Sequence, residues 1–208
     1  MNNKPTIGSR ERRAMGMMEP MNPDDMPMDG KPKKIAGYAA VFNSPTDIGG
    51  YFRERIAPGA FAKSIASDDV RALFNHEDCY VLGRTKNNTL ALAEDSKGLR
   101  FEAMPPDVMW CNDLMTQIKR GDISQCSFQF VSRREEWDET GDVPLRTLLE
   151  VDLIDVSPVT FPAYADTSVG VRSLQEWRAA HTHIINRTPV IRSRLRMRDA
   201  LRQRELAR

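Results

Sequence analysis

The chain has 208 residues, of which 40% are apolar and 28% charged, and its formal net charge is +1. That length supports one ordinary domain with a sizeable core, plus extensions. No apolar run approaches the roughly 20 residues that a membrane-spanning helix needs, and the first residues lack the apolar core of a secretory signal. Composition therefore argues against a membrane protein and favours a cytoplasmic one.

Charge is distributed unevenly along the chain. Residues 171–208 hold ten arginines against three acidic residues, a net charge of +7, whereas residues 34–170 carry a net charge of −7. An acidic body and a basic tail attract each other, and each attracts partners of the opposite charge.

The first 33 residues contain seven of the eleven methionines, together with several prolines, glycines and aspartates. They show neither the period of 2 that is typical of a strand nor the period of 3.6 that is typical of a helix. We therefore predict that residues 1–33 form a disordered, flexible arm.

Short strand patterns begin at Ile35. Runs rich in β-branched and aromatic residues, bounded by turn residues, predict strands at 35–43, 70–75, 89–93 and 98–103. Between the first two strands, residues 58–65 predict a short helix whose Phe61 packs in the core. A longer helix is predicted over 108–119, with Asp107 as its N-terminal cap and Gly121 at its end.

Two further strands follow this helix. Residues 126–133 alternate so that Ser127 lies on the face opposite Phe128 and Phe130. Residues 145–156 form the last long strand.

After residue 173 the pattern is helical, but its apolar stripe is ragged and interrupted by arginines. The predicted layout is an arm over 1–33, a folded domain over 34–172 and a basic, helical, removable extension over 173–208.

A hydroxyl, an imidazole and a carboxylate are what serine hydrolysis needs. Because the other two histidines lie in the predicted extension, His76 is the one candidate base of the domain. Ser124 and Ser127 compete as nucleophile, although Ser124 could instead satisfy backbone groups in a turn. Cys126 offers a cysteine hydrolase as an alternative, but adjacent strand residues point to opposite faces, so Cys126 is expected in the core.

The last strand offers three carboxylates that could orient the imidazole. Period 2 places Glu150 and Asp152 on one face and Asp155 on the other. Spacing alone leaves the choice among the three open.

Eight stretches of the chain occur in an order that resembles a known family. They are 37–42 (GYAAVF), 56–61 (IAPGAF), 73–76 (LFNH), 82–84 (LGR), 98–101 (GLRF), 118–123 (IKRGDI), 126–128 (CSF) and 156–164 (VSPVTFPAY). They resemble the tailed-phage prohead (capsid maturation) proteases, distant relatives of the herpesvirus assemblin proteases. The resemblance covers roughly residues 35–172.

This resemblance implies an α+β fold, with an antiparallel β-barrel core that is closed or nearly closed and is decorated by helices. It implies that His76 is the base and that Ser127, the serine of the family's Ser-Phe-x-Phe signature, is the nucleophile. An acidic residue would replace the second histidine of the assemblins. Laying the family pattern over the last strand favours Glu150, ahead of Asp152 and Asp155.

The implied function is that of a serine endopeptidase that cleaves major capsid protein and scaffold segments inside the procapsid, in the host cytoplasm, and also trims itself. A homo-oligomer is compatible with this role. No cofactor is implied, and a single core histidine does not make an ordinary zinc site, so no metal is expected.

Neither a membrane nor a specific nucleic acid is expected as a partner. The basic tail lacks interleaved aromatic residues, so its contacts with phosphate would be unspecific. The alternative function is a non-enzymatic β-barrel module for capsid assembly or scaffold binding, which gains support only if His76 is distant from Ser127.

Overall fold

The computed structural model describes residues 9–20, 34–161 and 174–179 of the chain. Its strands are β1 (Glu11–Met18), β2 (Ile35–Val41), β3 (Thr46–Ile48), β4 (Phe52–Ile56), β5 (Arg71–Phe74), β6 (Glu77–Arg84), β7 (Leu90–Glu94), β8 (Gly98–Ala103), β9 (Gln125–Asp138) and β10 (Leu145–Val159). The helices are α1 (Ala62–Ser67), the short 3-10 helix η2 (Thr85–Asn87), α2 (Met109–Arg120) and residues 174–179. Within the described ranges, no helix is long and apolar enough to cross a membrane.

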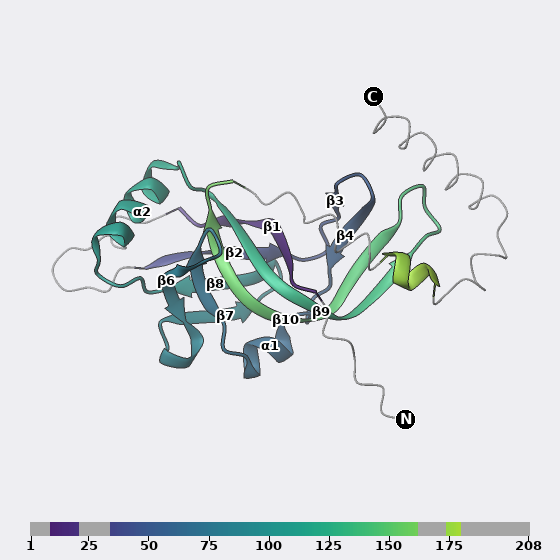
Figure 1. Cartoon of the computed structure of the whole chain (residues 1–208), viewed down its shortest axis with the longest axis horizontal. Coiled ribbons are helices and arrows are strands. Elements are labelled where there is room, and N and C mark those ends of the chain that lie inside the picture. Colours follow the sequence, from purple (N-terminus) through teal and green to yellow (C-terminus); the bar gives the residue numbers. More distant parts are fainter. Residues whose placement is uncertain (1–8, 21–33, 162–173, 180–208) are drawn as a thin grey trace.

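The described strands form one sheet in the order β3-β4-β10-β9-β1-β2-β8-β7, from which the β5–β6 hairpin branches at β10 (Figure 1). Strand β10 pairs in parallel with β4 along residues 145–148 and with β5 along 155–156, while β9 pairs antiparallel along its other edge. Because β10 is 15 residues long, it has room for two partners on one edge. The sheet therefore branches at β10 and is mixed in direction.

The α+β class is confirmed, since the structure is mostly sheet with few helices. The predicted closed or nearly closed antiparallel barrel is wrong. Among the described strands, no hydrogen-bonded ladder joins the two end strands β3 and β7. The β5–β6 hairpin pairs with β10 outside the main strand order. The two parallel pairings of β10 join segments far apart in the chain, so local strand patterns could not predict them.

The main core lies against the sheet and includes apolar side chains from α1 and from one face of α2. Phe61 is fully buried in the core, as predicted, although it lies just before α1 and not within it. Its ring packs edge-on against Phe128. Helix α2 buries Leu114 and Ile118 with their neighbours on the same face and ends at Gly121, which has the expected left-handed conformation. Its N-terminal cap is Val108 rather than the predicted Asp107, with no side-chain capping hydrogen bond.

Strand β1 overturns part of the predicted disordered arm. It lies between β9 and β2, with antiparallel hydrogen bonding to both (Figure 1). The sequence of β1 is ERRAMGMM, and its buried positions include the charged residues Glu11 and Arg13. The alternation of apolar and polar residues that is typical of a strand is therefore absent. The rest of the arm, residues 1–8 and 21–33, lies outside the described residues.

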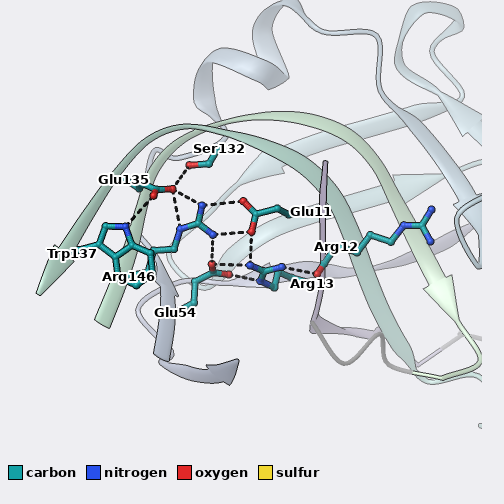
Figure 2. Close-up of polar contacts among 8 residues, drawn as sticks. All are labelled: Glu11, Arg12, Arg13, Glu54, Ser132, Glu135, Trp137 and Arg146. Carbon is teal, nitrogen blue, oxygen red and sulfur yellow. Dashed lines mark hydrogen bonds and ion pairs between the residues drawn. The ribbon is translucent and has the colours of Figure 1, made fainter. Parts of the chain in front are cut away.

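Those buried charges form one ion network, drawn in Figure 2. Arg13 donates two hydrogen bonds to Glu54, at 2.6 and 3.0 Å, and one to Glu11 at 2.6 Å. Arg146 donates to the same two carboxylates, at 2.7 to 2.9 Å, and to Glu135. Two buried arginines thus face two buried glutamates, Glu11 and Glu54, and the partly exposed Glu135, and these ion pairs connect β1, β4, β9 and β10.

A second, smaller apolar cluster lies where residues 174–179 contact the sheet. Leu174 is buried there with Ile48, Phe52 and Trp137, and Trp177 packs against Trp137. The predicted helical extension over 173–208 is therefore seen only in its first turn and a half, which docks on the sheet. The remainder lies outside the described residues.

Candidate active site

Ser127 lies near the start of β9, directly opposite Ser157 of β10. Strand β9 pairs with β10 at Ser127 and with β1 at the two neighbouring residues, Cys126 and Phe128, which holds its backbone in place. The side chains of Cys126 and Phe128 belong to the apolar core, and Ser127 points to the opposite face of the sheet, as the alternation predicts. Its hydroxyl is itself fully buried.

His76 lies in the two-residue turn that joins β5 to β6. Both turn residues, Asn75 and His76, have positive φ values, 55° and 59°, as in a type I′ hairpin turn. The second position of such a turn favours glycine, so a histidine there is held at a conformational cost of about 1 kcal/mol. The turn thereby projects the imidazole back over β10.

Asn75 ties this turn to the end of β10. Its backbone N–H donates to the Pro158 carbonyl at 3.0 Å, and its side chain exchanges hydrogen bonds with Thr160, at 2.8 and 3.1 Å. The position of His76 relative to β10 is therefore set by three hydrogen bonds from its neighbour.

Asp155 is the carboxylate beside the imidazole. It is 1% exposed and lies where β10 is paired with both β9 and β5. His76 Nδ1 is 2.6 Å from Asp155 Oδ1, and His76 Nε2 is 2.8 Å from Ser127 Oγ. An ionised carboxylate can only accept, so Nδ1 carries the proton and Nε2 is free to accept the serine proton.

Asp155 is not the carboxylate that family resemblance favours. Glu150 pairs with Lys63 at 2.9 Å instead of with the imidazole. Asp152, whose side chain is 38% exposed, accepts a hydrogen bond from Arg133 at 2.6 Å.

The predicted division of these acids by strand period is wrong, because the register of β10 shifts between Leu153 and Asp155. Asp152 lies opposite Val131 and Asp155 opposite Gln129, so the two share one face, and Asp155 is the one that the β5–β6 turn covers.

The other candidates lie apart from this arrangement. Ser124 is exposed just before β9, and its carbonyl accepts the backbone N–H of Met18 at 2.9 Å. Cys126 is buried in the core, its thiol donates to the Ser157 carbonyl at 3.3 Å, and burial raises the pKa of that thiol far above its ordinary value. A buried neutral thiol directed away from His76 does not act as a nucleophile.

Sequence reasoning missed two polar residues near the imidazole, Asn75 and Ser157. A signal existed for Ser157, because period 2 places it on the same face of β10 as Asp155. For Asn75 the signal was its position before His76 in a two-residue turn, where asparagine tolerates positive φ.

Serine, histidine and aspartate connected in this order by two short hydrogen bonds are the arrangement of a serine hydrolase. A family model described as Caudovirus prohead serine protease matches residues 22–180, and the chain belongs to that family. The match begins after β1, which nevertheless lies inside the sheet. Comparisons with curated proteins and with solved structures gave no match.

Proposed function

We propose that the chain is the serine endopeptidase that processes phage head proteins during capsid maturation, with Ser127 as nucleophile, His76 as base and Asp155 as the carboxylate that orients it. The observation that carries this proposal is the pair of hydrogen bonds on the two nitrogens of His76, 2.8 Å to Ser127 and 2.6 Å to Asp155. The condition under which a non-enzymatic module would be preferred, a histidine distant from the serine, is not met.

The chemistry follows from these positions. Ser127 Oγ attacks the scissile carbonyl while its proton passes to His76 Nε2, and Asp155 stabilises the imidazolium that forms. The imidazolium then gives the proton to the leaving amine, which departs from an acyl-serine. Water, deprotonated by the same imidazole, hydrolyses that ester and restores the serine.

The substrates that fit this proposal are the major capsid protein and scaffold segments inside the procapsid, in the infected host cell. The family description supports a role in the prohead. Ser127 is fully buried, so a substrate bond reaches it only after the residues around it move. Such a site suits a protease whose action has to wait for assembly.

The assignment of the carboxylate is tested by comparing two acids on the same strand. We expect Asp155→Asn to slow cleavage of co-expressed major capsid protein by about 10³- to 10⁴-fold, because the imidazole loses its tautomer bias and the support for its charge. Glu150→Gln, the matched control, should stay within about threefold of wild type, because its ion pair with Lys63 is exposed. Intact-mass analysis over time measures both.

If Glu150→Gln cleaved capsid protein much more slowly than Asp155→Asn, Glu150 would be the carboxylate that orients His76. Equal, near wild-type rates in both variants and in Asp152→Asn would mean that Ser127 and His76 act as a dyad.

Self-cleavage is the second part of the proposal. We expect the purified enzyme to shed peptide from one or both ends, because residues 171–208 carry a net charge of +7 and are attracted to the acidic body. Strand β1 should stay, since its backbone is hydrogen-bonded to β9 and β2. Mass spectrometry of the active protein and of Ser127→Ala, incubated side by side, measures the result.

Products that begin or end within residues 11–18 would contradict the retention of β1. An active enzyme that keeps all 208 residues would remove self-cleavage from the proposal and leave the basic tail as a packaging contact.

A further inference from the structure

Asp155 has a second hydrogen-bond partner besides the imidazole. Ser157 Oγ donates to Asp155 Oδ1 at 2.6 Å, the same oxygen that accepts from His76 Nδ1. Ser157 is fully buried, two residues further along β10 and on the same face. It also lies directly opposite Ser127 in the β9–β10 ladder.

The other oxygen of this carboxylate makes no comparable contact. Oδ2 of Asp155 is buried, and within the described part of the chain it has no hydrogen-bond partner. Side-chain hydrogen bonds from His76 and Ser157, both to Oδ1, are therefore what orients the carboxylate. A buried charge with so few donors depends strongly on each of them.

Among the described residues, the Ser157 hydroxyl has one hydrogen-bond partner, the Asp155 carboxylate. The Ser157 backbone carbonyl accepts the Cys126 thiol. A buried hydroxyl at this position costs free energy unless it is hydrogen-bonded, and the partner it has is the carboxylate that holds the base.

We propose that Ser157 is a positioning residue of the active site: its hydroxyl holds Oδ1 of Asp155 in the plane where that oxygen accepts the Nδ1 proton of His76. This inference rests on the proposed function, in which Asp155 orients the base. Ser157 itself touches neither the substrate nor the reacting atoms. Its effect passes through the carboxylate to the imidazole, and from there to Ser127.

Matched substitutions at position 157 test the role. The Ser157→Thr variant keeps the hydroxyl. Valine has nearly the same shape as threonine but no hydroxyl, so Ser157→Val is its matched partner. The Ser157→Ala variant removes the hydroxyl without adding bulk. We expect the alanine and valine variants to cleave co-expressed capsid protein about ten- to a hundredfold more slowly than wild type, the range that loss of one hydrogen bond to a charged group produces. The threonine variant should retain most of the wild-type rate.

Ser64→Ala is the control for the loss of a buried hydroxyl elsewhere. Ser64 is 1% exposed, donates to Asp68 and accepts the Leu153 backbone N–H at 2.7 Å, so its removal perturbs stability without touching the site. Urea unfolding of every variant separates a change in stability from a change in rate. The Ser64→Ala variant should cleave at close to the wild-type rate.

A second measurement does not depend on activity. The chain has only three histidines, so a spectrum of protein labelled with ¹⁵N-histidine is simple, and His76→Gln identifies the signal of His76. We expect a strongly downfield Nδ1 proton in wild type and Ser157→Thr, with exchange against solvent about tenfold faster in Ser157→Ala and Ser157→Val.

The two readouts separate the two proposals. If wild type does not cleave capsid protein, the proposed function fails, while the proton spectrum still tests the positioning. If Ser157→Ala and Ser157→Val keep both the cleavage rate and the proton exchange within about threefold of wild type, the inference about Ser157 is wrong. A threonine variant as slow as the valine variant would also overturn it, because shape rather than the hydroxyl would then matter.

Discussion

Replacement of Ser127 by alanine is expected to abolish cleavage of the major capsid protein. Loss of the nucleophile removes the covalent step, which lowers the rate by about a millionfold in a serine protease that works through a triad. The fold should survive, because Ser127→Ala removes one oxygen atom from a position whose backbone is paired with β10 and whose two neighbours, Cys126 and Phe128, are paired with β1. Co-expression with capsid protein, followed by intact-mass analysis, measures the result.

Ser124→Ala is the matched control, since it makes the same chemical change three residues earlier on an exposed side chain. It should process capsid protein at the wild-type rate. Mature-sized capsid protein produced by Ser127→Ala would refute the assignment, and loss of processing in Ser124→Ala alone would transfer the role to that serine.

The second large effect concerns the buried ion network rather than the chemistry. We expect Arg146→Met to lower the free energy of unfolding by about 3 to 5 kcal/mol, because it leaves Glu11 and Glu54 buried and short of a positive partner. Methionine fills much of the same space, so the loss is mainly of charge. Urea unfolding followed by tryptophan fluorescence is a suitable measurement, since the Arg146 guanidinium lies 5.8 Å from the centre of the Trp137 ring.

Lys63→Met is the control for this experiment. It removes a cation from an ion pair in which the lysine is 74% exposed, and pairs of that kind contribute at most about 1 kcal/mol. If the two variants were destabilised equally, the network would contribute no more than an exposed pair.

Acid should weaken the same network. Burial by itself raises the pKa of Glu11, but the hydrogen bonds and charges of Arg146 and Arg13 outweigh burial and hold that pKa below its ordinary value. A carboxylate with a lowered pKa in the folded state stabilises the protein above its unfolded-state pKa, and this stabilisation is lost as the pH falls through the folded-state value. The loss therefore belongs to strongly acidic solution and not to neutral pH.

Local patterns were sufficient for much of this protein. The strands β2, β5, β7, β8, β9 and β10 and helix α2 follow from period, turn residues and a C-terminal glycine, because those signals act over a few residues. Helix α1 was predicted to begin four residues too early, over 58–65 instead of Ala62–Ser67. The same alternation correctly placed Ser127 on the face opposite Phe128. It failed for the acids of β10, because the register shift between Leu153 and Asp155 puts Asp155 on the same face as Asp152. The lone histidine of the domain and the Ser-Phe motif singled out His76 and Ser127.

Features that depend on pairing between distant segments could be found only in the tertiary structure. Strand β1 is invisible locally because Glu11 and Arg13 occupy inward positions that only partners from other strands, Glu54 and Arg146, make tolerable. The branch of the sheet at β10, in place of a closed barrel, depends on which edges pair. The choice of Asp155 over Glu150 likewise depended on the register shift in β10 and on which residues of that strand the β5–β6 turn covers, since burial and hydrogen bonding are properties of the assembled fold.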